Sequence, residues 1–197
     1  MDVINQFLNK TNSLLSNSSN LNKYLCTNIM KQHHLDYLLG CLQENKNDSI
    51  LLEKIYQAQT DGDRNYHYFC DYKGETVTVI LSRRTDMIFG AYTSHNIDSN
   101  ENFKQDNKSF LFSLTKEKKY PIKKSSYATY NTNKVFNIGF GYPDGILLKE
   151  NFLSVVDNFA EVWGDCYHSK YPGKRILLAG EENFQVEEVE VFKVIRN

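Results

Sequence analysis

The chain has 197 residues, of which 41% are hydrophobic and 24% are charged, and its formal net charge is −1. This length suits one domain with a sizeable core, and the content of 13 Tyr and 12 Phe excludes a disordered chain. The balanced charge provides no general attraction to nucleic acid or to an anionic membrane. We therefore expect neither nucleic acid nor a membrane to be a direct partner.

The cysteines give no sign of a metal or disulfide framework. Cys26, Cys41, Cys70 and Cys166 form no C-x-x-C pair, and no histidine lies at zinc-ligand spacing from them. No apolar run has the length of a signal peptide or of a membrane span. These observations predict free thiols, a cytoplasmic location, and no metal or cofactor.

Helical patterns dominate the first part of the chain. Residues 1–22 carry a short amphipathic pattern followed by Asn and Ser, and this segment docks either on its own domain or on a partner. We therefore divide the chain into a helical arm over residues 1–34 and a domain over residues 35–197. Within the domain, apolar spacing predicts helices over 35–42, 51–56 and 66–70.

After Gly74 the apolar pattern changes to the two-residue period of β-strands. Small residues at Gly90 and Ala91, inside one such strand, indicate a bend or the close approach of another backbone. Helices followed by many strands predict an α+β fold, with two antiparallel sheets packed as a sandwich and flanked by short helices. The strands are predicted over 76–81, 87–92, 110–114, 119–122, 127–130, 135–140, 146–148, 153–156, 161–163 and a last segment between 184 and 194.

Two places in the sequence are candidates for function. On the last strand, alternation places Glu188 and Glu190 on one face, which is either simply the solvent face or an acidic strip that contacts a partner. Cys70 lies beside Asp71, and a neighbouring carboxylate raises the pKa of a thiol and so reduces its reactivity. Cys70 is therefore either a buried core residue or, less simply, a redox-active thiol. No arrangement of histidines indicates a catalytic site, and none of these residues is assigned a catalytic role.

Five segments resemble, in the same order, the motifs of the TLDc domain family. They are LEKIYQAQTDGD at 52–63, CDYKGETVTVI at 70–80, MIFGAYTS at 87–94, SFLFSLT at 109–115 and LAGEENFQVEEVEVFKV at 178–194. The chain departs from the family pattern at Glu75 and Ala91, and the glycine-rich segment 135–144 lacks a histidine that other members carry. Of the positions suspected to be functional in the family, Gly90 and Glu190 match.

The resemblance implies a compact sandwich of two antiparallel sheets and a link to protection against oxidative stress. It also implies binding to the peripheral part of the vacuolar-type proton ATPase, with no settled enzymatic reaction. The leading hypothesis is therefore a non-catalytic protein-binding module that binds and regulates this ATPase, in the cytoplasm at an organelle membrane complex. The alternatives are a structural subunit of a ciliary or cytoskeletal assembly, and a thiol-based redox enzyme that uses Cys70 or Cys166.

Overall fold

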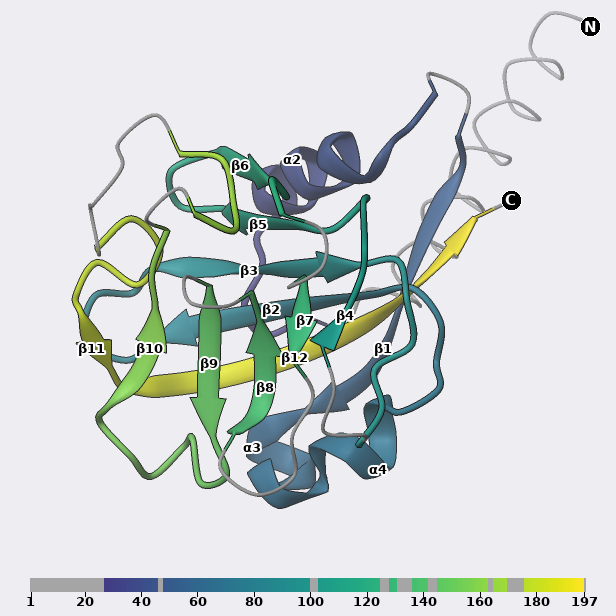
Figure 1. Ribbon diagram of the computed structural model, residues 1–197. Helices are drawn as coiled ribbons and strands as arrows, with labels where there is room; N and C mark the ends of the chain where they lie inside the picture. Colours follow the sequence, from purple (N-terminus) through teal and green to yellow (C-terminus); the bar gives the residue numbers. More distant parts are fainter. Residues whose placement is uncertain are drawn as a thin grey trace, which may run out of the picture.

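The computed structural model describes residues 27–45, 48–99, 103–124, 128–130, 136–141, 145–162, 165–169 and 176–196 (Figure 1). Two antiparallel β-sheets lie face to face, with helices at the edge of the sandwich and on the outer face of the larger sheet. The predicted α+β sandwich is therefore confirmed. The helix expected within residues 1–22 and the thiol of Cys26 lie outside the described residues.

The larger sheet has six strands, and the C-terminal strand runs through its interior. The order is β1-β12-β2-β3-β5-β6, and every neighbouring pair is antiparallel. In this order the strands are β1 (Ile50–Gln57), β12 (Val186–Arg196), β2 (Thr76–Ser82), β3 (Ile88–Thr93), β5 (Phe110–Ser113) and β6 (Lys118–Pro121). The first and last strands of the domain, β1 and β12, are thus paired side by side, so the two ends of the domain are joined in one sheet.

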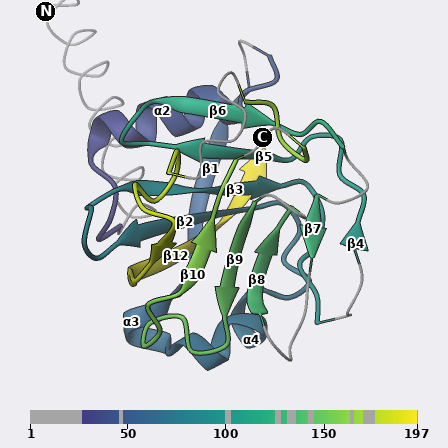
Figure 2. The same cartoon turned by 60° about the vertical axis from the view of Figure 1, so that its left-hand side comes forward.

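The smaller sheet has four strands in the order β11-β10-β9-β8, and its strands cross those of the larger sheet steeply (Figure 2). They are β8 (Phe136–Phe140), β9 (Ile146–Lys149), β10 (Asn158–Ala160) and β11 (Asn183–Phe184). A separate two-stranded ribbon joins β4 (Phe103–Lys104) to β7 (Thr129–Tyr130).

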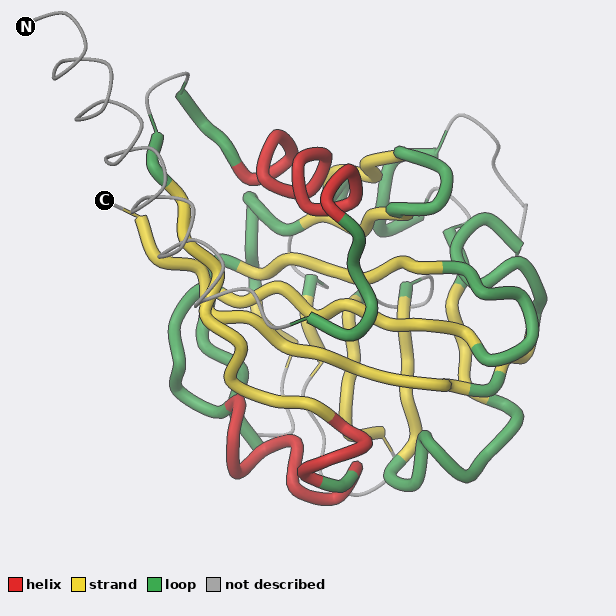
Figure 3. Tube along the Cα trace, turned by 180° about the vertical axis from the view of Figure 1, so that it is seen from behind, coloured by secondary structure: helices red, strands yellow, loops and turns green. Residues whose placement is uncertain are grey.

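Helices pack on the outer face of the larger sheet and at one edge of the sandwich. The longest described helix, α2 (Gln32–Leu42), lies across the outer face of the larger sheet, as the view from behind shows (Figure 3). The short helices α3 (Ala58–Asp61), η1 (Asp63–Asn65) and α4 (Tyr66–Cys70) follow β1 and lie at one edge of the sandwich. Within the described residues, no helix is long and apolar enough to cross a membrane.

The larger sheet has a hydrophobic core on each of its two faces. The core between the sheets contains Phe89, Phe152 and Phe184, all fully buried. The second core lies between the sheet and α2, and it contains Leu38 and Phe192. Because side chains alternate along a strand, β12 supplies Val191 to the first core and Phe192 to the second.

The prediction of a helix over 51–56 is wrong, because this segment is β1. Its pairing with β12 is irregular between Lys54 and Tyr56, which marks a β-bulge. The bulge lets Leu52 face the core under α2 while Tyr56 faces the core between the sheets. The resulting apolar spacing imitates a helical stripe, which explains the error.

Two smaller strand predictions in the second half of the chain are also wrong. Residues 153–156 contain a turn and a bend but no strand, and the strand in the next region spans Asn158–Ala160 and ends before residues 161–162; residue 163 lies outside the described residues. The strands predicted over 76–81, 87–92 and 110–114 are confirmed as β2, β3 and β5 to within one or two residues.

Candidate functional site

The carboxylate of Glu190 is buried in the middle of β12 and is held by three donors. The side chain has no exposed surface, and Lys54 Nζ lies 3.1 Å from its carboxylate. Thr27 Oγ1 donates a hydrogen bond of 2.5 Å to Glu190, and the backbone N–H of Asn28 donates one of 2.8 Å. Glu190 therefore fastens the segment just before α2 to the sheet.

Glu188 makes a similar link two residues earlier on the same face. The residue is 6% exposed, and its carboxylate accepts hydrogen bonds of 3.0 Å from Gln57 Nε2 and from the backbone N–H of Gln59. Of the two alternatives for Glu188 and Glu190, the solvent face is therefore wrong, because both carboxylates are buried and paired within the domain. Segments 27–28 and 57–59 cover this end of the sheet and supply donors, so both carboxylates can be buried.

Gly90 lies in β3 where three strands approach closely. It is opposite Val79 of β2 and opposite Phe112 of β5. A Cβ atom at Gly90 would collide with the backbone carbonyl oxygen of Thr78 and would lie 2.8 Å from Cζ of Phe112. The predicted close approach of another backbone is confirmed, and it supplies a packing reason for glycine at this position.

Cys70 ends α4 and is fully buried in the core between the sheets. Burial raises the pKa of its thiol well above the ordinary value, and the carboxylate of Asp71 raises that pKa further. Asp71 itself accepts a hydrogen bond of 2.7 Å from Ser99 and contacts His67 Nδ1 at 2.9 Å. A neutral, inaccessible thiol is a poor nucleophile, so this environment favours the core interpretation of Cys70.

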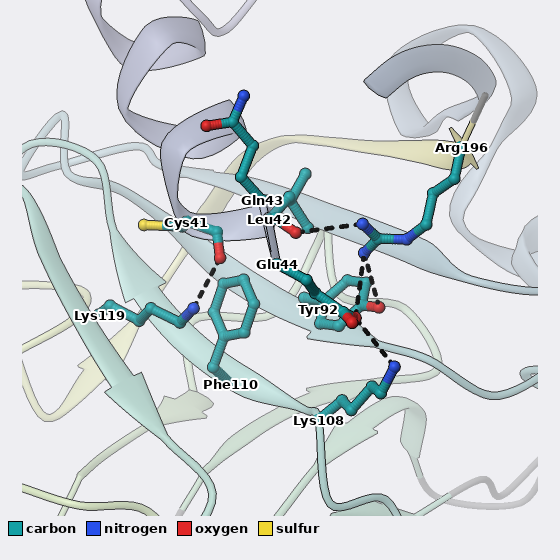
Figure 4. Close-up of a pocket in the computed structure, with 9 residues that line it drawn as sticks. All are labelled: Cys41, Leu42, Gln43, Glu44, Tyr92, Lys108, Phe110, Lys119 and Arg196. Carbon is teal, nitrogen blue, oxygen red and sulfur yellow. Dashed lines mark hydrogen bonds and ion pairs between the residues drawn. The ribbon is translucent and has the colours of Figure 1, made fainter. Parts of the chain in front are cut away.

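A pocket that the sequence did not predict lies between the end of α2 and the larger sheet (Figure 4). Its volume is about 310 Å³. Three cationic side chains and one carboxylate line it, together with two aromatic rings. The lining residues are Cys41, Leu42, Gln43, Glu44, Tyr92, Lys108, Phe110, Lys119 and Arg196.

One side of this pocket is a closed hydrogen-bond network around Arg196. Its Nε donates to Glu75 at 2.9 Å, and its Nη1 donates to the carbonyl oxygen of Leu42 at 3.2 Å. Its Nη2 lies 3.3 Å from the hydroxyl of Tyr92, which donates to the same Glu75 carboxylate at 2.8 Å. The guanidinium therefore ties the C-terminal end of β12 to the end of α2.

The other side of the pocket is organised around the ring of Phe110, with Lys108 and Lys119 on its two sides (Figure 4). Lys108 is paired with Glu44 at 2.9 Å, and both side chains of that pair are exposed. Lys119 Nζ lies 4.1 Å from the centre of the Phe110 ring and donates a hydrogen bond of 2.6 Å to the carbonyl oxygen of Cys41. No local sequence pattern joins the residues that line the pocket, because they come from five separate segments of the chain.

Among the described residues, no group of three or more His, Cys, Asp or Glu side chains is placed to hold a metal ion. The protein is an antiparallel β-sandwich in which Glu188, Glu190 and Cys70 are buried and stabilise the fold. The comparison with known families gives this fold its identity. A model of the TLDc domain matches residues 25–195, and the chain belongs to this family. Among curated proteins, none matches the chain.

Proposed function

We propose that this protein is a non-catalytic binding module that docks on the peripheral, cytoplasmic part of the vacuolar-type proton ATPase and regulates its assembly or activity. Membership of the TLDc family supports this proposal, since the resemblance to that family implies binding to this ATPase together with a link to resistance against oxidative stress. The cytoplasmic location follows from the proposal, because the peripheral part of this ATPase faces the cytoplasm.

The observation that carries the proposal is the burial of the candidate functional side chains Cys70 and Glu190. Cys70 and Glu190 are fully buried, and Glu190 binds three internal donors. A catalytic group has to reach its substrate, whereas Cys70 packs in the core between the sheets and Glu190 holds the segment before α2 to the sheet. The surface features that remain, such as the pocket beside Phe110, can recognise a partner without performing chemistry.

Co-purification from the native cell tests the proposal. The tagged chain is captured under gentle lysis, and the captured proteins are quantified against the tag alone. We expect enrichment of peripheral ATPase subunits. If these subunits are not enriched and axonemal or cytoskeletal proteins are, the protein is a structural subunit of another assembly and the proposal fails.

A peroxide-consumption assay separates the binding module from a redox enzyme. The purified protein should consume peroxide no faster than a Cys70→Ser or a Cys166→Ser variant of equal concentration. A clear drop in rate on either substitution would instead identify a working thiol and overturn the non-catalytic assignment.

A further inference from the structure

The pocket beside Phe110 has an uneven distribution of charge. Lys108, Lys119 and Arg196 line it, against the single carboxylate of Glu44. Arg196 is satisfied by Glu75 and by the end of α2, as described above, so its charge is largely compensated. The excess of positive charge is therefore at the two lysines, in a protein whose overall net charge is −1.

Lys119 is the cation in this pocket for which the described residues supply no acidic partner. Among the described residues its ammonium contacts only the carbonyl oxygen of Cys41 and the face of Phe110, and no carboxylate forms an ion pair with it. Desolvation of the ammonium against these groups lowers its pKa. An anion that entered the pocket would pair with Lys119 and offset the free-energy cost of desolvating its charged ammonium.

The pocket already shows which kind of anion it accepts. The carboxylate of Glu44 lies 2.9 Å from Lys108 and 4.0 Å from Arg196. Because both members of the Glu44–Lys108 pair are exposed, this contact is weakly held and can be exchanged. Lysine, an arginine fork and backbone N–H groups all bind phosphate. Here the fork of Arg196 is occupied and the backbone group beside Lys119 is a carbonyl, so only the lysines remain as donors, and this favours the singly charged carboxylate over a phosphate.

We propose that this pocket binds the carboxylate of an Asp or Glu side chain presented by a protein partner, with Lys119 as its main ion-pair donor. Lys108 is the second donor once Glu44 is displaced, and the ring of Phe110 forms the floor between the two lysines. The volume of about 310 Å³ is at the lower end for a ligand pocket, which suits a single side chain. This inference rests on the proposed function, since it identifies how a partner would be recognised.

Titration with short peptides tests the pocket directly, without the partner. The probe is an acetylated and amidated peptide of three glutamates, and the control is the same peptide of three glutamines. Binding is followed by the shifts of backbone amide signals of ¹⁵N-labelled protein. We expect the glutamate peptide, and not the glutamine peptide, to shift signals around Cys41, Phe110 and Lys119.

Two neighbouring lysines on β6 give a matched pair of variants. Lys119→Gln should weaken binding of the glutamate peptide about threefold to fivefold, as expected for loss of one solvent-accessible ion pair. Lys118→Gln removes the same charge from the adjacent residue, which is not in the pocket, and should leave binding unchanged. Equal effects of the two substitutions, or tighter binding of inorganic phosphate than of the glutamate peptide, would overturn the inference.

Capture from the native cell keeps this inference separate from the proposed function. If the wild-type chain captures ATPase subunits and Lys119→Glu captures them equally well, the pocket inference fails and the proposed function stands. If the wild-type chain captures no ATPase subunits, the proposed function fails, and the pocket inference is then decided by the peptide titration alone. We expect Lys119→Glu, but not Lys118→Glu, to reduce the captured subunits.

Discussion

Substitution of Glu190 by glutamine should destabilise the fold strongly, although glutamine has nearly the same shape. The native carboxylate accepts hydrogen bonds from Thr27, Asn28 and Lys54. In glutamine, one oxygen is replaced by an NH₂ group, which would face these donors instead of accepting from them. The ammonium of Lys54 would also lose its counter-charge at a position where only 19% of its side chain is exposed.

The expected cost follows from the burial of the pair. Removing one partner of a buried ion pair costs about 3 to 5 kcal/mol. Lys54 keeps some exposure and also donates to Gln57 at 2.7 Å, so we take the lower end, about 3 kcal/mol. With an m-value of about 2 kcal/mol per molar urea, the midpoint of unfolding should fall by about 1.5 M.

Urea unfolding followed by circular dichroism measures this change, and β12 itself provides the control. Glu187 pairs with Arg83, but both side chains are more than two-fifths exposed, so Glu187→Gln should cost about 0.5 kcal/mol or less. Faster hydrogen exchange of the Asn28 amide in Glu190→Gln would show that the segment before α2 is released. Equal midpoints for the two variants would refute the assignment of Glu190 as a buried anchor.

Three further predictions concern packing, acid stability and thiol reactivity. Gly90→Ala should lower the free energy of unfolding by about 3 kcal/mol or prevent folding, because the added Cβ would collide with the backbone of β2. Gly40 lies in α2 with open space around it, so Gly40→Ala should raise the free energy of unfolding by about 0.5 to 1 kcal/mol, and thermal unfolding compares the two variants. Asp106 lies between β4 and β5 and accepts hydrogen bonds from Thr93, Ser94 and the backbone N–H of Lys108. Burial alone would raise the pKa of Asp106, but these hydrogen bonds outweigh burial and lower it. Its contribution to stability is therefore complete above the unfolded-state pKa of about 3.9 and is lost as the pH falls through the lower folded-state pKa; Asp106→Asn should be less stable near neutral pH and show a shallower loss on acidification, as urea midpoints measured against pH would reveal. A maleimide reagent should modify Cys41, which is partly exposed, well before Cys70; peptide mapping that found Cys70 modified first would contradict its assignment to the core.

Local patterns were enough to predict the central strands. In β2 and β5 the alternation of side chains is set by the geometry of the strand itself, so the residues that face each core can be read from neighbours two positions apart. The close approach at Gly90 was predictable for a similar reason, since a glycine inside a strand marks a place where a side chain does not fit.

The errors arose where a contact across the chain decides the local structure. The bulge in β1 forms against β12, which lies more than 130 residues away, and it changes the face on which Tyr56 lies. The burial of Glu188 and Glu190 likewise depends on donors from Thr27 and Gln59. An acidic strand residue has the same local sequence signal whether water or a distant donor covers it.

The sequence by itself determined the family, the α+β sandwich and the alternation of most strands, because these are properties of short segments and of their order. Only the tertiary structure decided that both faces of β12 are covered, and where Lys119 lies relative to Phe110 and Cys41. A strand specifies two faces but not what packs on either of them. The environment of a charged side chain is therefore set by segments that are distant in the chain, and this holds for both the buried acids and the pocket.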